Sequence, residues 1–368
     1  MKVIVCCEKQ DELIDLECIL EELRSYNENI EFVLIDLSEI TGCQIRPNIK
    51  IYKNIHKFNC DNAGDYRGKN FLSKLVAVLN TTFFIKKIIE MENSSILLTG
   101  VSLIFFRIIY FLRGFTRVKV VSYIRSNFTT NDKGISILPK FIKFLVLKVS
   151  VFKPCAADFL LCIDEASSAF IKNEYYKNSK ANIKTIGSIS SYNFKKIGLM
   201  SNGASNFGIK EKNTVCFITS AFDWHGNGAG DKLQSDILRK LLLLASKEMF
   251  DLQIKVHPRD QAEKYLKLYP SAVIVNNKNF LSVETIYVSM LSTLSLELHS
   301  AGYRSLFVCD NQSYKTFENW YKCNSVMPVN IHCDEFIDTL NASKFSRMED
   351  KIINPAEIAA SIINNLCY

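Results

Sequence analysis

The residues best suited to chemistry begin with the heptapeptide IKVHPRD at 254–260. Its β-branched residues predict a strand, and alternation along a strand places Lys255 and His257 on the same face. Pro258 cannot donate to a strand ladder and therefore marks the point where the chain leaves the sheet. A histidine held there, with Arg259 two residues on, could bind a phosphate group or give it a proton. A purely structural histidine at a strand end is the alternative.

Three hydroxyl residues, Ser292, Thr293 and Ser295, form a second candidate. They follow a predicted strand and open a predicted helix at 292–302, where unpaired backbone N–H groups and the helix dipole attract an anion. Ser292 could be only a capping residue, but a cap needs one hydroxyl and three are present. Glu297, little more than a turn further on, could accept hydrogen bonds from ribose hydroxyls.

The loop ITSAFDWHGNGAGD at 218–231 is the third candidate. Ser220 ends a predicted strand, and Asp223 and His225 place two ionisable groups at the tip of the loop. Gly226 is the first of three glycines, which would let the backbone approach a ligand closely. The spacing is neither that of a phosphate-binding P-loop nor that of a dinucleotide fingerprint. A flexible surface loop is the alternative.

Asp132 is the only acid among ten basic residues between 105 and 153. It lies in the loop SNFTTNDKG at 126–134, after a predicted strand, and is a candidate general base. A solvated turn is the alternative, because Asn-Asp-Lys-Gly is good turn sequence. The chain contains no GxSxG, HExxH or DxD pattern, and its five histidines lack metal-ligand spacing. We therefore expect no metal.

The elements that must position these residues alternate along the chain. Its 368 residues suggest about two domains, and 48% hydrophobic residues exclude intrinsic disorder. Short β-rich runs alternate with longer helical stretches, which predicts an α/β fold with parallel sheets. A polar stretch at 195–212 predicts a linker. We expect two Rossmann-like domains facing a cleft, at 1–195 and 212–350, and a closing helix at 351–368.

Ligands of open parallel sheets bind beyond the carboxyl ends of the strands, where all four candidates lie. The strands expected in the first domain are at 2–7, 30–37, 95–100, 118–124, 157–164 and 183–187. Those expected in the second are at 213–220, 251–258, 271–277, 283–290 and 305–311.

The net charge of +7 raises the question of an anionic partner, such as a membrane surface or a nucleic acid. A predicted helix at 138–153 mixes Lys with Phe, Leu, Ile and Val, which suits an anionic membrane surface; a core helix with a solvated edge is the alternative. The apolar stretch at 95–112 is interrupted by Arg107 and Gly100, so a buried strand and helix are favoured over a membrane span. No nucleic-acid reader motif is present.

The opening MKVIVCCEKQ resembles a buried strand rather than a secretory signal. Twelve cysteines occur without any CxxC pair, which favours free thiols in a reducing compartment. We therefore expect a cytoplasmic protein, with peripheral contact to the inner face of the cell membrane through 138–153.

The second half of the chain resembles the donor-binding domain of GT-B glycosyltransferases over roughly 183–310. The resemblance is carried by the His257-Pro258 strand end and by the Ser292-Thr293 helix start. A Glu one turn later and a short Gly turn into another strand complete it. More narrowly, the pattern resembles bacterial CMP-sugar enzymes: sialyltransferases, polysialyltransferases, and Kdo transferases of capsule or lipopolysaccharide synthesis.

The resemblance implies that the HP histidine and the Ser/Thr pair contact the nucleotide phosphate, with His257 assisting the departure of CMP. It also implies direct displacement at the anomeric carbon, with Asp132 or Asp223 as the base. Such sialyltransferases carry two acids before a glycine, whereas this chain has one acid in Asn131-Asp132-Lys133-Gly134. Together with the residues singled out above, the expected donor-binding set is Ser220, His225, Gly226, Lys255, Pro258, Arg259, Ser292, Thr293, Ser295 and Glu297.

The implied co-substrate is a nucleotide sugar, most simply a CMP-linked sialic-acid-like or Kdo-like sugar, with no metal or other cofactor. The implied acceptor is a bacterial surface glycan or glycolipid bound by the first domain. Other interpretations are a CDP-polyol phosphotransferase and a UDP-sugar transferase or epimerase. A non-catalytic glycan- or nucleotide-binding protein is the interpretation from another functional class.

Overall fold

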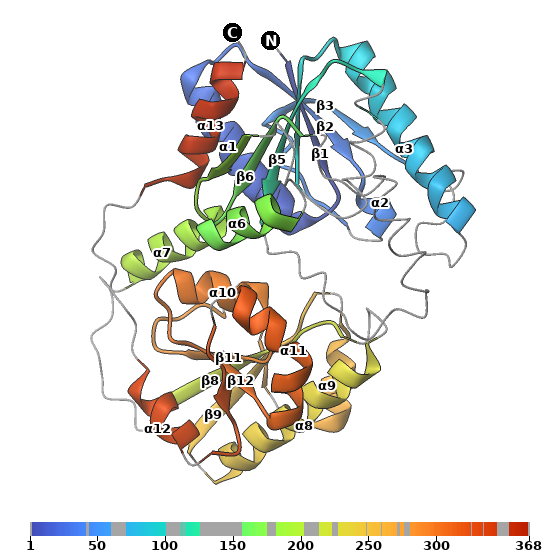
Figure 1. Ribbon diagram of the computed structural model, residues 1–368. Helices are drawn as coiled ribbons and strands as arrows, with labels where there is room; N and C mark the ends of the chain where they lie inside the picture. Colours follow the sequence, from blue (N-terminus) through green and yellow to red (C-terminus); the bar gives the residue numbers. More distant parts are fainter. Residues whose placement is uncertain are drawn as a thin grey trace. The chain divides into compact units, whose positions relative to one another are not determined.

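The computed structural model in Figure 1 describes two compact units. Unit 1 contains the described residues up to 125, those from 157 to 189, and the C-terminal segment 353–366. Unit 2 contains the described residues from 190 to 343. The described residues are 2–41, 44–59, 71–100, 112, 115–125, 157–174, 182–201, 213–222, 227–247, 249–258, 260–270, 273–275, 280–324, 326–333, 335–343 and 353–366.

Unit 1 is built on a parallel sheet of seven strands in the order β3-β2-β1-β4-β5-β6-β7. The strands are β1 (Lys2–Cys7), β2 (Glu31–Asp36), β3 (Tyr52–Lys57), β4 (Ile96–Thr99), β5 (Lys119–Ile124), β6 (Phe159–Cys162) and β7 (Asn182–Thr185). The helices are α1 (Gln10–Tyr26), α2 (Ser38–Thr41), α3 (Phe71–Glu92), α6 (Glu165–Glu174), α7 (Ile189–Ser201), at whose first residue the two units divide, and α13 (Pro355–Leu366).

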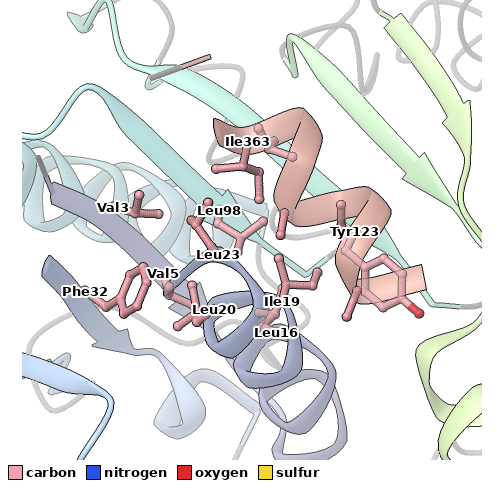
Figure 2. Packing of buried hydrophobic residues seen from close by; sticks show 14 of the residues in the cluster. Val3, Val5, Leu16, Ile19, Leu20, Leu23, Phe32, Leu98, Tyr123 and Ile363 are labelled. Carbon is pink, nitrogen blue, oxygen red and sulfur yellow. The ribbon is translucent and has the colours of Figure 1, made fainter. Parts of the chain in front are cut away.

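Both faces of the unit 1 sheet are covered, which explains the continuous apolar strands. Ile4 and Cys6 face a core that includes side chains of α3. Val3 and Val5 face a second core, formed with α1 and α13. Figure 2 shows this second core, where Ile363 of α13 joins the α1 leucines over β1 and β4. Strands buried on both faces are typical of parallel sheets.

Unit 2 repeats the arrangement with a parallel sheet of six strands in the order β10-β9-β8-β11-β12-β13. The strands are β8 (Asn213–Ile218), β9 (Phe250–Lys255), β10 (Val273–Ile274), β11 (Ile286–Ser289), β12 (Ser305–Cys309) and β13 (Val329–Asn330). The helices are α8 (Gly228–Ser246), α9 (Ala262–Leu268), α10 (Thr293–Ser300), α11 (Asn311–Cys323) and α12 (Glu335–Ala342).

In each sheet the first strand of the unit lies in the interior of the strand order. The next two strands extend the sheet to one side, and the following strands extend it to the other. The order therefore reverses between β1 and β4 in unit 1, and between β8 and β11 in unit 2. Ligands of such sheets bind outside the carboxyl ends of the strands at this point.

Among the elements that differ from the sequence predictions are β3, α7 and β10. The strand β3 was not predicted, because side chains in its middle, including Asn54, are exposed and carry no apolar alternation. The helix α7 enters the stretch predicted as a linker from residue 195. The strand expected at 271–277 is described only over the two residues of β10.

The expectations about membrane contact and about cysteines fall on different parts of the chain. The basic helix at 138–153 lies outside the described residues. Among the helices that are described, none has the length and apolar character needed to cross a membrane. Seven cysteines within the described ranges are free thiols, as expected: 6, 7, 18, 162, 216, 309 and 333.

Candidate functional site

The strongest candidate site lies where β9, β8 and β11 end side by side in unit 2. The backbone N–H of His257, after β9, donates to the Thr219 hydroxyl after β8 at 2.8 Å. The neighbouring Ser220 hydroxyl donates to the carbonyl of Leu291, the residue before Ser292. These two hydrogen bonds join three chain segments that are far apart in the sequence.

The helix α10 begins at this edge directly after β11. Ser292 is its N-cap residue, and its hydroxyl accepts the backbone N–H of Ser295 at 3.3 Å. Leu294 and Leu298 anchor the helix against the sheet, so its first turn is fixed at the strand ends. The first turn of a helix presents N–H groups without intrahelical acceptors, and Thr293 at its start is exposed. This end of the helix can therefore receive an anion.

Two further hydroxyls are buried at the same place. Ser289, the last residue of β11, and Ser295, in the first turn of α10, are fully buried. Neither hydroxyl has a hydrogen-bond partner among the described residues. A buried hydroxyl without a partner costs about 1–3 kcal/mol, which is unusual at two neighbouring elements. Sequence reasoning found Ser295 but missed Ser289, whose only signal was a serine at the end of an apolar strand.

Lys255 ends β9, but its side chain is buried and not presented at the edge of the sheet. Its side chain is 5% exposed, and its Nζ donates to the Val256 carbonyl at 3.2 Å and lies 5.6 Å from the centre of the Phe280 ring. Burial lowers the pKa of this ammonium group. The nearby Cys216 of β8 acts against this lowering of the Lys255 pKa. Burial raises the pKa of the Cys216 thiol to about 12. Lys255 therefore lies within the face of the sheet, behind the strand end.

The other predicted donor-binding residues have different positions. His257 is half-buried and Pro258 is exposed at the end of β9. Glu297 is buried on α10. Its carboxyl group is therefore not on the surface, where it could accept hydrogen bonds from ribose hydroxyls. Asp132, Asp223, His225, Gly226 and Arg259 lie outside the described residues.

A buried polar network beneath the strand ends was missed by sequence reasoning. The Gln234 side chain on α8 accepts the backbone N–H of Ser220 at 2.6 Å and donates to its carbonyl at 3.1 Å. The same amide group donates to the Tyr265 hydroxyl on α9 at 3.1 Å. The available signal was a glutamine on the apolar stripe of α8, which continues with Ile237, Leu238 and Leu241.

The geometry above is that of a GT-B protein, with two α/β units of Rossmann strand order. No family model matches the chain, and no curated protein matches it. Solved structures do match it along its whole length. A UDP-GlcNAc 2-epimerase of Methanocaldococcus jannaschii, in complex with UDP-GlcNAc and UDP, is 12% identical, with a TM-score of 0.60 over 100% of both chains.

Two further structures give the same result. The UDP-GlcNAc 2-epimerase from Neisseria meningitidis bound to UDP-GlcNAc is 15% identical, with a TM-score of 0.58 over 100% of this chain and 99% of that chain. The glycotransferase of kitacinnamycin is 9% identical, with a TM-score of 0.54 over 99% and 98%. At these identities the likeness shows the fold. It confirms the GT-B fold expected from the sequence and does not extend to the CMP-sugar specificity.

Proposed function

We propose that this chain is an enzyme that acts on a nucleotide sugar and binds the nucleotide phosphate at the carboxyl edge of the unit 2 sheet. One observation carries the proposal: hydrogen bonds join the ends of β8, β9 and β11. Ser220 is bonded to the residue before Ser292, the N-cap of α10, and His257 is bonded to Thr219, the neighbour of Ser220. The fold supports it, because solved structures of the same fold are described as UDP-GlcNAc 2-epimerases and a glycotransferase.

Glycosyl transfer is the reaction that we propose. The acceptor hydroxyl oxygen forms a bond to the anomeric carbon while the bond from that carbon to the phosphate oxygen breaks. The electron pair leaves with the phosphate, and the hydroxyl proton passes to a base, for which Asp132 and Asp223 remain the candidates. The N-terminus of α10 and His257 stabilise the charge that develops on the departing phosphate, as preorganised dipoles and donors do in general. The acceptor, a surface glycan or glycolipid, would bind unit 1.

Two donor nucleotides are candidates. The sequence resemblance favours CMP linked to a sialic-acid-like or Kdo-like sugar. The second candidate is a UDP-sugar, used by a transferase or by an epimerase. It is favoured by the two fold neighbours whose structures contain UDP-GlcNAc. Either donor would present phosphate oxygens to the same helix N-terminus.

A thermal-shift panel separates the donors. The protein is heated with CMP, CDP, UDP, GDP or ADP in large excess, and a ligand at a hundred times its Kd adds about 2.7 kcal/mol of stability. We expect CMP or UDP to raise the Tm most, and the nucleotide that does so identifies the donor. A larger shift with GDP or ADP would reject both donors. No shift with any nucleotide would contradict the proposed function.

We also propose that no metal ion or other cofactor is needed, because the helix terminus and His257 supply the electrostatic stabilisation themselves. Within the described ranges, no three His, Cys, Asp or Glu side chains gather as a metal site would require. The nucleotide-induced shift in Tm should therefore be the same with and without EDTA. A shift that disappears in EDTA would reject this part of the proposal.

Peripheral membrane contact through 138–153 remains part of the proposal on sequence grounds alone. Lysines among large apolar residues should bind anionic vesicles and not neutral ones, and binding should weaken as salt is added. Co-sedimentation with phosphatidylglycerol and with phosphatidylcholine vesicles measures this. Equal sedimentation with both lipids, or with neither, would exclude an electrostatic membrane contact.

A further inference from the structure

The polar network beneath the strand ends closes into a ring. It runs from Ser220 through Gln234 to Tyr265, whose hydroxyl donates to the Asp260 carboxylate at 2.6 Å. The backbone N–H of Asp260 then donates to the His257 carbonyl at 2.9 Å. The His257 N–H closes the ring by donating to Thr219, the neighbour of Ser220, at 2.8 Å.

The ring of hydrogen bonds begins just beyond the last backbone pairing between β8 and β9. The last ladder bond between β8 and β9 at this end runs from the Thr219 N–H to the Lys255 carbonyl, at 3.1 Å. Ser220 lies one residue further on, where a neighbouring strand no longer pairs with its backbone. The Gln234 amide group accepts the backbone N–H of Ser220 and donates to its carbonyl, as a neighbouring strand would do. Buried backbone groups need such partners, and Gln234 is only 1% exposed.

Tyr265 connects Gln234, and through it Ser220, to the loop after β9. Its hydroxyl accepts from Gln234 and donates to Asp260, and the Thr219 side chain is also hydrogen-bonded to it. Burial, and then the nearby Asp260 carboxylate, keep the pKa of Tyr265 above its usual range, so the hydroxyl retains the proton that it donates. The two loops that carry Ser220 and His257 are thus tied to one side chain.

We propose that Gln234 and Tyr265 are positioning residues for the nucleotide phosphate: they fix the loops after β8 and β9 relative to each other, so that Ser220 and His257 meet one ligand. The inference rests on the proposed function, since it assigns these two loops to one phosphate. Neither residue touches the ligand itself. A binding site holds its geometry only when the residues behind it are held by packing and hydrogen bonds.

The chain contains a matched control on the same pair of helices. Tyr269 is the C-cap residue of α9, and its hydroxyl donates to the Ser235 carbonyl of α8 at 3.2 Å. It therefore links α9 to α8 one turn away from Tyr265, and this hydrogen bond does not involve the loops after β8 and β9. Tyr265→Phe and Tyr269→Phe each remove one hydroxyl between α8 and α9. Tyr265→Phe should lower the Tm more, because it leaves more hydrogen-bond partners without a hydroxyl, so the two variants are compared at a temperature where both are folded.

The test compares nucleotide affinity in the two variants well below their Tm. Whichever of CMP and UDP stabilises the wild type is titrated by calorimetry. Tyr265→Phe should weaken binding about fivefold or more, the effect of losing one hydrogen bond, and Tyr269→Phe should leave the affinity unchanged. Equal affinities in both variants would overturn the positioning role.

Backbone hydrogen exchange supplies a readout that needs no nucleotide. The His257 N–H belongs to the ring, so its exchange should become about tenfold faster in Tyr265→Phe and remain as in the wild type in Tyr269→Phe. Unchanged exchange in Tyr265→Phe would overturn the inference on its own. If the wild type binds no nucleotide, the proposed function fails, while the exchange of this N–H still shows whether Tyr265 holds the loop.

Discussion

Replacing His257 with alanine is expected to lower the rate of sugar transfer about 10²–10⁴-fold while the fold persists. The imidazole group of His257 lies just after β9 and can give a proton to a departing phosphate. Its backbone N–H and carbonyl would still bond to Thr219 and Asp260 in the variant, so the loop should keep its position. The rate is measured as release of the nucleotide identified by the thermal-shift panel, with acceptor present.

A histidine elsewhere in unit 2 gives the matched control for this experiment. His299 is exposed in the last turn of α10, at the opposite end of the helix from Ser292. His299→Ala should turn over as the wild type does. A His257→Ala variant within a few-fold of the wild type would remove His257 from the reaction. A wild type that binds nucleotide but forms no product over long incubation would instead indicate a non-catalytic binding protein.

Glu12 in unit 1 is expected to make the stability of the protein strongly pH-dependent. The residue is 6% exposed in the first turn of α1. Burial raises the pKa of its carboxyl group to about 8; Lys9 and Arg125 act against the shift, and Glu8 and Asp11 add to it. The folded protein therefore holds a proton here that the unfolded chain releases near its ordinary value of 4.5.

The sign follows from this difference in proton binding. The contribution of Glu12 is most favourable below about pH 4.5 and is lost progressively as the pH rises to about 8, at up to about 1.4 kcal/mol per pH unit. Glu12→Gln carries no charge in either state and escapes this loss. The free energy of unfolding of Glu12→Gln, relative to the wild type, should therefore rise by a few kcal/mol between about pH 5 and pH 8.

Urea unfolding followed by circular dichroism across this pH range measures the difference. Other titrating groups are common to both proteins, so their contributions largely cancel in the comparison. Glu21→Gln removes a carboxylate from the exposed face of the same helix and is the control. If the difference in unfolding free energy between Glu12→Gln and the wild type stays constant across this range, Glu12 is ionised in the folded protein and its burial does not govern its protonation.

The sequence predicted the framework because the strands of both sheets are buried. In β1, every residue from Val3 to Cys7 is fully buried, and such a strand can only be a run of apolar residues. The same holds for the end of β8. Where burial is one-sided or absent, as in β3, the pattern disappears and the strand was missed. A strand can therefore be predicted from its apolar residues only where both of its faces are buried.

The candidate site was predictable only in its local parts. Ser292 as a helix cap depends on a few neighbouring residues, and the sequence contains them. The sequence placed Lys255 on the correct face of β9 but did not predict that its side chain is buried. Phe280, whose ring lies over the ammonium group, comes 25 residues later in the chain. Gln234 and Tyr265 gain their roles from contacts between α8, α9 and two loops. No spacing along the sequence indicates such contacts.

The measurement that tests the central claim most directly is a binding cycle between the phosphate and His257. Wild type and His257→Ala are each titrated with CMP and cytidine, and with UDP and uridine. The account predicts that the wild type binds one nucleotide at least tenfold more tightly than its nucleoside, and that this preference shrinks markedly in His257→Ala. Equal binding of nucleotide and nucleoside by the wild type, or a phosphate preference that His257→Ala leaves intact, would contradict a phosphate site at this edge of unit 2.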